Sequence, residues 1–142
     1  MRFMKIFFTI LLATLINGCS KSDGVLTPNQ RTENLLKSQV WKLTETRIDG
    51  MVTNLYDGLT LSFGSKIYSS VNGGTIWPTS GTWTLVDNNG DLILRDNFLS
   101  IEIVSADSSQ LVLTFTWGST TYDKGRTGSL KGFYRMTFLS KK

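Results

Sequence analysis

The sequence predicts an all-β protein, an eight-stranded antiparallel up-and-down barrel with a short N-terminal helix. From Val40 onward, apolar and polar residues alternate in short runs, and a period of two is typical of a strand with one buried face. Gly, Asn, Asp and Ser residues separate the runs, a spacing that is typical of a sandwich or barrel. Eight such runs are present, and eight strands can close into a barrel without exposed edges.

The chain begins with a segment that is typical of an export signal. Arg2 and Lys5 precede an apolar run over residues 6–16. This run is too short to cross a bilayer, since a spanning helix needs about 20 apolar residues. Gly18 then precedes Cys19, the only cysteine of the chain. The order of these features resembles the lipobox of bacterial lipoproteins.

The lipobox resemblance implies that residues 1–18 are removed and that Cys19 becomes an acylated first residue. Two or three chains such as palmitate, at about 0.8 kcal/mol per buried methylene, would anchor the protein in a bilayer. Residues 19–32 are then the lipidated cysteine and a flexible tether. Ser20 stands where an inner-membrane retention signal has aspartate, which favours the outer membrane and leaves its periplasmic or surface face open. The alternative is an ordinary cleaved signal with an incidental cysteine.

A short helix is expected immediately before the first strand. Thr27 offers an N-cap, Pro28 suits the first helical position, and Gln30 stands where a capping box needs it. The helix should then extend to about Ser38. Thr32 is a second possible cap, so two starting points remain open.

The strands are expected at residues 40–48, 59–63, 66–71, 81–86, 91–95, 98–104, 110–117 and 132–140. Within them, alternation places Trp41 and Trp83 in phase with core-facing leucines, so both are expected in the barrel core. The same reasoning selects Ile67 and Val71 in the third strand, and Leu92 and Leu94 in the fifth, as core-facing residues. Turns are expected at 49–50 and 87–90, and a long loop at 118–128.

Three segments of this pattern resemble the lipocalin-like domain of many small gram-negative lipoproteins. They are "LLKSQVWKLTETRIDG" at 35–50, "SGTWTLVDNNGDLIL" at 80–94 and "IEIVSADSSQLVLTF" at 101–115. The resemblance covers roughly residues 33–140 and departs from the family pattern at 56–74 and in the 118–128 loop. It implies a lipocalin-like barrel domain over residues 33–142, without a substrate.

Composition removes several function classes. The chain has no histidine and one cysteine, which excludes histidine-based triads, imidazole-bound zinc and thiolate metal clusters. The net charge of +4 includes two basic residues of the N-terminal segment, and no basic stripe marks a nucleic-acid site. The carboxylates are scattered through turns and outward strand faces. We therefore expect a non-enzymatic protein without cofactor, metal or nucleic-acid partner, and a hydrolase is the least favoured alternative.

Three aromatic residues are the candidate ligand contacts. Trp77 lies in the loop "NGGTIWPTSG", and Trp117 and Tyr122 flank the polar segment that follows the seventh strand. As ligand contacts, they would offer stacking surfaces at the barrel mouth. The structural alternatives are that Trp77 packs on the barrel rim and that the other two belong to a solvated hairpin loop.

Two functions remain open. In the first, the protein is a membrane-anchored binding protein for a small apolar or amphipathic ligand, held in or at the mouth of the barrel. The interior of an eight-stranded barrel holds either packed side chains or one small ligand. In the second, a solid barrel makes protein or glycan contacts as an accessory subunit of an envelope complex. That function predicts Trp77, Trp117 and Tyr122 exposed together at one end, away from the tether.

Overall fold

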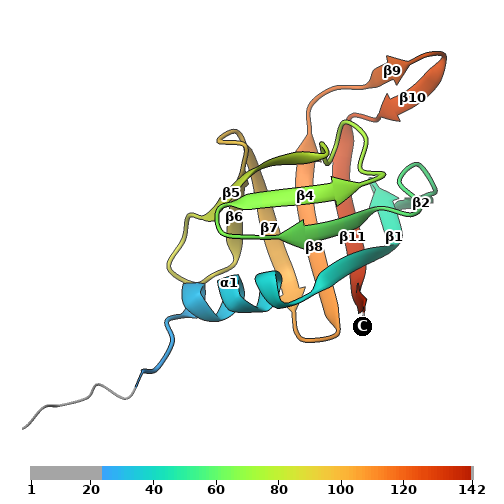
Figure 1. Cartoon of the computed structure of the whole chain (residues 1–142). Helices are drawn as coiled ribbons and strands as arrows, with labels where there is room; N and C mark the ends of the chain where they lie inside the picture. Colours follow the sequence, from blue (N-terminus) through green and yellow to red (C-terminus); the bar gives the residue numbers. More distant parts are fainter. Residues whose placement is uncertain (1–23, 142) are drawn as a thin grey trace, which may run out of the picture.

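Eight antiparallel strands close into a barrel in the computed structural model, which describes residues 24–141 (Figure 1). The barrel strands are β1 (Val40–Ile48), β3 (Thr60–Phe63), β4 (Ile67–Val71), β5 (Ser80–Leu85), β6 (Leu92–Arg95), β7 (Leu99–Ala106), β8 (Gln110–Trp117) and β11 (Gly132–Lys141). Each strand pairs with its neighbours along the chain, so the predicted up-and-down barrel is confirmed. Cys19 and the expected signal segment lie outside the described residues.

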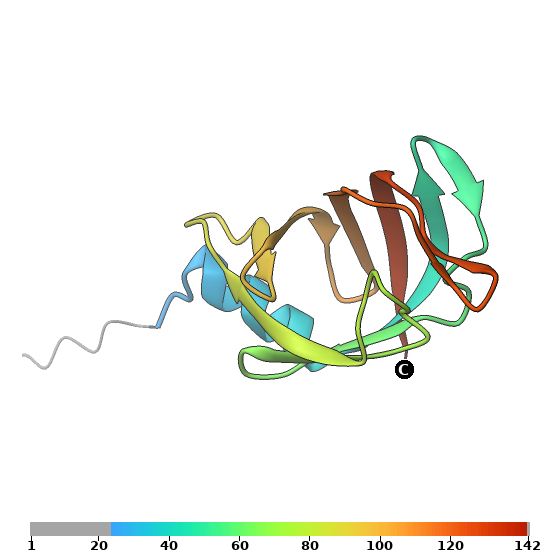
Figure 2. The same cartoon turned by 90° about the horizontal axis from the view of Figure 1, so that it is seen from above.

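The barrel closes between its first and last strands. β1 pairs with β11 from Val40 opposite Lys141 to Ile48 opposite Tyr134, with one irregularity between Leu43 and Glu45. Figure 2 shows β1 and β11 side by side where the ring closes. Every barrel strand therefore has both of its neighbours within residues 24–141, and this part of the chain forms the closed barrel.

Helix α1 (Pro28–Ser38) packs against one end of the barrel. Thr27 caps it, and Gln30 completes the predicted capping box, so the alternative start at Thr32 is not used. Asn29 Nδ2 donates a hydrogen bond to the carbonyl of Asp87 in the β5–β6 turn at 2.6 Å. The helix therefore spans the boundary expected between residues 32 and 33.

Three short strands were not predicted from the sequence. β2 (Met51–Thr53) pairs with the end of β1, and β9 (Thr121–Asp123) pairs with β10 (Arg126–Ser129) as a separate hairpin. The hairpin occupies the segment expected to be a loop and projects from the barrel (Figure 1). β2 has only three residues and β9 and β10 are short and mostly polar, so none of the three shows the apolar alternation on which the prediction depended.

The barrel core confirms part of the predicted inward face and corrects the rest. Trp41 and Trp83 are buried, as expected. In β4, however, Ile67 and Val71 are exposed, while Tyr68 and Ser70 point inward.

The predicted face of β6 is also wrong. Ile93 and Arg95 are its buried residues, whereas Leu92 and Leu94 are only partly buried. Three consecutive apolar residues carry no alternation that could have identified the inward face of this strand.

The two ends of the barrel differ in what covers them. At one end lie α1, the β5–β6 turn and the β7–β8 turn (Figure 1). At the other end, which we call the mouth, lie the β4–β5 loop, the β6–β7 turn and the β9–β10 hairpin. The chain enters through α1, so the mouth faces away from the segment that precedes the helix. Within residues 24–141, no helix has the length and apolar character that a bilayer crossing requires.

Candidate functional site

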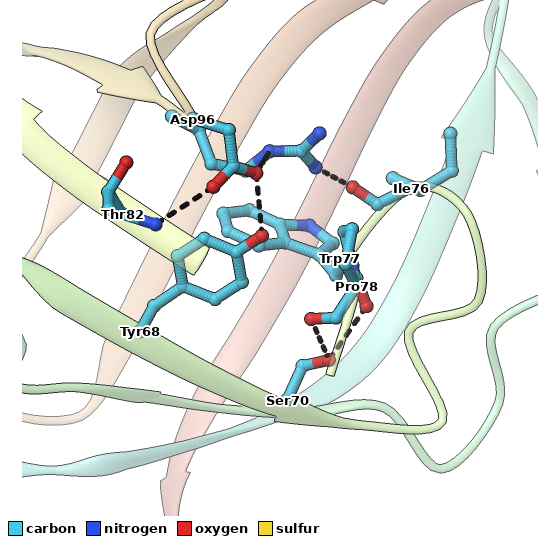
Figure 3. Close-up of polar contacts among 8 residues, drawn as sticks. Tyr68, Ser70, Ile76, Trp77, Pro78, Thr82 and Asp96 are labelled. Carbon is cyan, nitrogen blue, oxygen red and sulfur yellow. Dashed lines mark hydrogen bonds and ion pairs between the residues drawn. The ribbon is translucent and has the colours of Figure 1, made fainter. Parts of the chain in front are cut away.

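The β4–β5 loop folds into the mouth and fills it. Ile76 is fully buried, and Trp77 retains only 1% of its exposure. Ser70 Oγ lies 2.7 Å from the carbonyl oxygen of Trp77 and 2.8 Å from that of Pro78 (Figure 3). Gly73 allows the chain to approach itself here, because a Cβ at this position would overlap the Trp77 carbonyl. The predicted rim position of Trp77 is in fact an insertion into the core.

Arg95 lies beneath this loop as a buried cation. Its side chain is 1% exposed, and its Nε lies 3.1 Å from Asp96 Oδ2. Its Nη1 donates a hydrogen bond to the carbonyl of Ile76. Burial lowers the pKa of Arg95, although the nearby Tyr68 and Asp96 oppose that shift. The guanidinium remains charged at neutral pH, since an arginine pKa begins above about 12.

Asp96 joins Arg95 to the neighbouring strands. Its carboxylate accepts hydrogen bonds from the Tyr68 hydroxyl and from the Thr82 amide, both at 2.8 Å (Figure 3). Burial raises the pKa of Tyr68 well above its usual range, and the hydrogen bond to Asp96 adds to this effect. Gly81 leaves room for the arrangement, because a Cβ there would lie 2.6 Å from the Tyr68 hydroxyl.

Three aromatic rings, those of Trp77, Phe98 and Trp117, surround the guanidinium of Arg95 and form an aromatic cage. The central carbon of the guanidinium lies 5.4 Å from the ring centroid of Trp77, 5.4 Å from that of Phe98 and 5.7 Å from that of Trp117. These distances are within the range of cation–π attraction, which is strongest for desolvated cations. Phe98 differs from the other two rings because 64% of it is exposed.

Polar atoms around the cage are left without partners. Trp77 Nε1 is buried and has no hydrogen-bond partner, and Arg95 Nε makes no aligned hydrogen bond despite its proximity to Asp96. Among the described residues, Arg95 Nη2 also has no hydrogen-bond acceptor. Most buried polar groups in proteins are satisfied, so these unused donors require an explanation.

A groove of about 350 Å³ lies beside the cage. Two of its lining residues, Phe98 and Trp117, also contact the guanidinium, so the groove and Arg95 are neighbours. Trp117 is held in place because its Nε1 donates a hydrogen bond to Ser129 Oγ at 3.1 Å. The remaining lining residues are Leu99, Thr116, Gly118 and Ser119. The groove thus has an aromatic wall, one leucine and several polar groups.

The barrel interior itself is occupied by large side chains. Those with almost no exposure include Trp41, Tyr68, Trp77, Tyr134 and Phe138. Three other hollows, of about 540, 390 and 240 Å³, are lined mainly by strand ends and outward-facing residues. Arg95 itself lines none of these four hollows; the groove shares Phe98 and Trp117 with the aromatic surroundings of Arg95, and the 240 Å³ hollow is lined by Thr82, whose amide donates to Asp96. We therefore treat Arg95, Asp96 and this groove as the candidate site.

The structure brings together two of the three aromatic residues predicted as ligand contacts. Trp77 and Trp117 meet at the Arg95 guanidinium. Tyr122 lies on β9 in the projecting hairpin and is 74% exposed. The joint exposure expected for a scaffold protein is not observed, because Trp77 is buried.

Sequence reasoning missed Arg95, Asp96 and Phe98. It took Leu92 and Leu94 as the core-facing pair, which would turn Arg95 outward. It counted Asp96 among scattered turn carboxylates. A charged residue at a strand end is normally exposed, so the sequence contained no signal that separated this arginine from the others.

The site combines charged groups with aromatic rings. One cation, one carboxylate, a tyrosine hydroxyl and three aromatic rings converge on it. No cluster of three metal-ligating side chains occurs within residues 24–141.

Comparison with protein-family models gave no match, and no curated protein matches the sequence significantly. The structure alone therefore identifies the fold, and the geometry of the site is the basis for a function.

Proposed function

We propose that the protein is a non-enzymatic, lipocalin-like lipoprotein that binds a small amphipathic ligand at the mouth of its barrel. One observation carries this proposal: the groove beside Phe98 and Trp117 joins apolar walls to a buried polar cluster. Binding pockets are typically apolar clefts of about 300–1,000 Å³ with a few convergent polar groups. The groove is within this range, at its lower end. An amphipathic molecule would match both parts.

The packed interior favours the mouth over the barrel centre as the ligand position. Trp77 and Ile76 occupy the central space at this end, and both are buried. A ligand in the groove needs no displacement of these two side chains. It would lie against Trp117 and beneath the exposed ring of Phe98.

The proposed anchor places this mouth away from the membrane. Acylation of Cys19 would attach the chain to the outer membrane through residues that precede α1, and α1 lies at the opposite end from the groove. The groove would then be open to the surrounding space, where it can take up a ligand without contact with its own bilayer.

A binding experiment on the processed chain tests the proposal. The chain from residue 19 onward, with Cys19→Ser to keep it free of lipid, is mixed with a brominated twelve-carbon fatty acid, because bromine quenches nearby tryptophans. We expect saturable quenching, and Trp117→Ala should weaken binding about tenfold, as loss of a central aromatic contact often does. Tyr122→Ala is the matched control and should bind as the unchanged chain does. Quenching that is absent, or that Trp117→Ala leaves unaltered, would contradict the proposal.

The scaffold function remains the second candidate because of the β9–β10 hairpin. The hairpin strands pair only with each other, and Tyr122 near its tip is largely exposed. A free hairpin edge can pair with another chain. Site-specific photocrosslinking from position 122 in the envelope should then give one discrete adduct, and the same crosslinker at the exposed position 102 of β7 should give none.

A further inference from the structure

Arg95 has hydrogen-bonding capacity that the fold does not use. A guanidinium carries five N–H donors, and the described residues supply one hydrogen bond to Nη1 and one close carboxylate beside Nε. The side chain is nevertheless 1% exposed, and its Nε is buried without a hydrogen-bond partner. A buried donor without a partner is costly.

The neighbours of Arg95 also determine which of its N–H donors are occupied. Asp96 lies beside the Nε edge of the guanidinium, and the carbonyl of Ile76 accepts from Nη1. Trp77, Phe98 and Trp117 contact the guanidinium through their rings, which accept no conventional hydrogen bond. Nη2 therefore remains available on a cation that touches both aromatic walls of the groove.

Phe98 is the member of the cage that can move most easily. It lies in the β6–β7 turn and is 64% exposed, whereas Trp77 is buried and Trp117 is hydrogen-bonded to Ser129. A rotation of the Phe98 ring would give up its contacts with Arg95 and Trp117 and would expose the guanidinium to the groove, while Trp77 and Trp117 keep their places. Side-chain rotation of this kind is common when a ligand binds.

We propose that Arg95 recognises the anionic head group, a carboxylate or phosphate, of an amphiphile whose apolar chain lies in the groove. This inference rests on the proposed function and names the class of its ligand. The head group would accept hydrogen bonds from the free donors of Arg95, and a hydrogen bond between two charged groups is about twice as strong as a neutral one. Asp96 would keep its present partners and hold the guanidinium in place.

The test compares ligands that share one chain and differ in head group. Dodecanoate, dodecyl phosphate and the uncharged dodecyl monoglyceride are titrated against the processed Cys19→Ser chain, with displacement of an uncharged brominated monoglyceride as the readout, so that the probe itself does not depend on Arg95. We expect the two anions to bind about tenfold more tightly than the neutral ligand, the gain of one charge-assisted hydrogen bond. Inorganic phosphate alone should displace nothing, which distinguishes an amphiphile site from a site for free anions.

Arg95→Met should remove this preference for anions. It replaces the cation with an apolar side chain of similar length, so the neutral monoglyceride should bind within about twofold of its original affinity, since its chain contacts are unchanged. Arg135→Met is the control. Arg135 is exposed on the outer face of β11, and its loss changes the net charge equally without touching the cage. We expect this control to retain the full preference.

Each outcome leads to a different conclusion. Equal binding of charged and neutral ligands by the unchanged chain overturns the inference about Arg95 and leaves the proposed function standing. Persistent anion preference in Arg95→Met also overturns it. Absence of binding by every amphiphile overturns the proposed function itself. If Arg95→Met fails to fold, the head-group comparison on the unchanged chain still decides the ligand class. Arg95→Lys, which keeps the positive charge, then tests the role of the side chain at position 95.

Discussion

Arg95 is costly to bury, because it places a full positive charge inside a small barrel. Its burial is offset by a carboxylate, a carbonyl and three aromatic rings. Of these partners, only Asp96 carries an opposite charge, and Asp96 is itself held by Tyr68 and by the Thr82 amide. Removal of one member of a buried ion pair leaves an uncompensated charge, which is strongly destabilising.

Asp96→Asn should therefore destabilise the protein by about 3 kcal/mol, the lower part of the range for a broken buried pair. The substitution keeps the shape of the side chain and removes only its charge. Urea unfolding followed by circular dichroism measures the change. Asp123→Asn in the projecting hairpin is the control and should stay within about 0.5 kcal/mol of the original stability. The same stability for both variants would show that Asp96 does not compensate Arg95.

The double variant Arg95→Met with Asp96→Asn separates charge from packing. It contains no buried charge, so it should be more stable than Asp96→Asn alone. Hydrophobic replacement of a whole buried ion pair is often neutral or stabilising. If the loss of stability in the double variant equals the sum of the losses in the two single variants, the two side chains act independently.

At the scale of elements, the β4–β5 loop decides whether the mouth is filled. The loop can bring Trp77 into the barrel only because Gly73 has no side chain, since a Cβ there would overlap the Trp77 carbonyl. Gly73→Ala should cost about 2 kcal/mol, as overpacking of a close contact does. It should also shift tryptophan fluorescence to longer wavelength as Trp77 moves toward solvent. Gly118→Ala, where nothing lies near the added Cβ, is the matched control and should leave the spectrum unchanged.

The β7–β8 turn should make the stability of the fold depend weakly on pH in acid. Asp107 Oδ1 accepts hydrogen bonds from Ser109 Oγ at 2.7 Å, from the Ser109 amide at 2.7 Å and from the Gln110 amide at 2.8 Å. These bonds, the Ser109 hydroxyl first, lower the pKa of Asp107 below its usual value. Since the folded state favours the charged form, this stabilisation is complete above the unfolded pKa of about 3.9 and is lost as the pH falls through the folded value.

Asp107→Ala should accordingly melt at a lower temperature than the unchanged protein at neutral pH. The difference should shrink as the pH is lowered below about 4, because the unchanged protein loses the same hydrogen bonds on protonation. Melting curves across this pH range test the expectation. A gap between Asp107→Ala and the unchanged protein that stays constant with pH would contradict this expectation.

The sequence predicted the elements better than the faces they present. Apolar alternation and turn residues located the helix and all eight barrel strands to within about two residues, which is the usual uncertainty of element boundaries. The faces of β4 and β6 were wrong because burial there depends on contacts between distant segments. Tyr68 is inward because it reaches Asp96, and Arg95 is inward because it reaches Ile76. Such partners cannot be identified from local periodicity.

At the scale of the whole molecule, the two ends of the barrel carry different features. α1 lies at one end, and the groove beside the Arg95 surroundings lies at the other, at the β6–β7 turn and the end of β8. Between them, large side chains fill the interior and form the core of the barrel. This division explains why the strand pattern alone predicted the architecture but not the site. The site depends on a loop, a turn and two strand ends. Trp77 comes from the β4–β5 loop, and Asp96 and Phe98 come from the β6–β7 turn. Arg95 and Trp117 are the last residues of β6 and β8.

The filled interior also predicts how the whole barrel responds to alkaline pH. Burial raises the pKa of Tyr56 and of Tyr68 well above the usual tyrosine range, with hydrogen bonds to Tyr134 and Asp96 adding to the shift. The folded protein thus keeps both hydroxyls protonated, whereas an unfolded tyrosine ionises at about pH 10. The contribution of these two tyrosines to stability should be constant below that pH. Above it, stability should fall by up to about 1.4 kcal/mol per pH unit for each tyrosine, because the unfolded state binds fewer protons.

Alkaline titration followed by tyrosinate absorbance and near-ultraviolet circular dichroism measures this response. We expect ionisation of the buried tyrosines to coincide with loss of the folded spectrum, because neither can ionise while it remains buried. Tyr68→Phe removes one ionisable group and keeps the ring, so its stability should fall with a shallower slope above pH about 10. Ionisation of Tyr56 or Tyr68 within an intact barrel would show that the mouth admits water and hydroxide to its core.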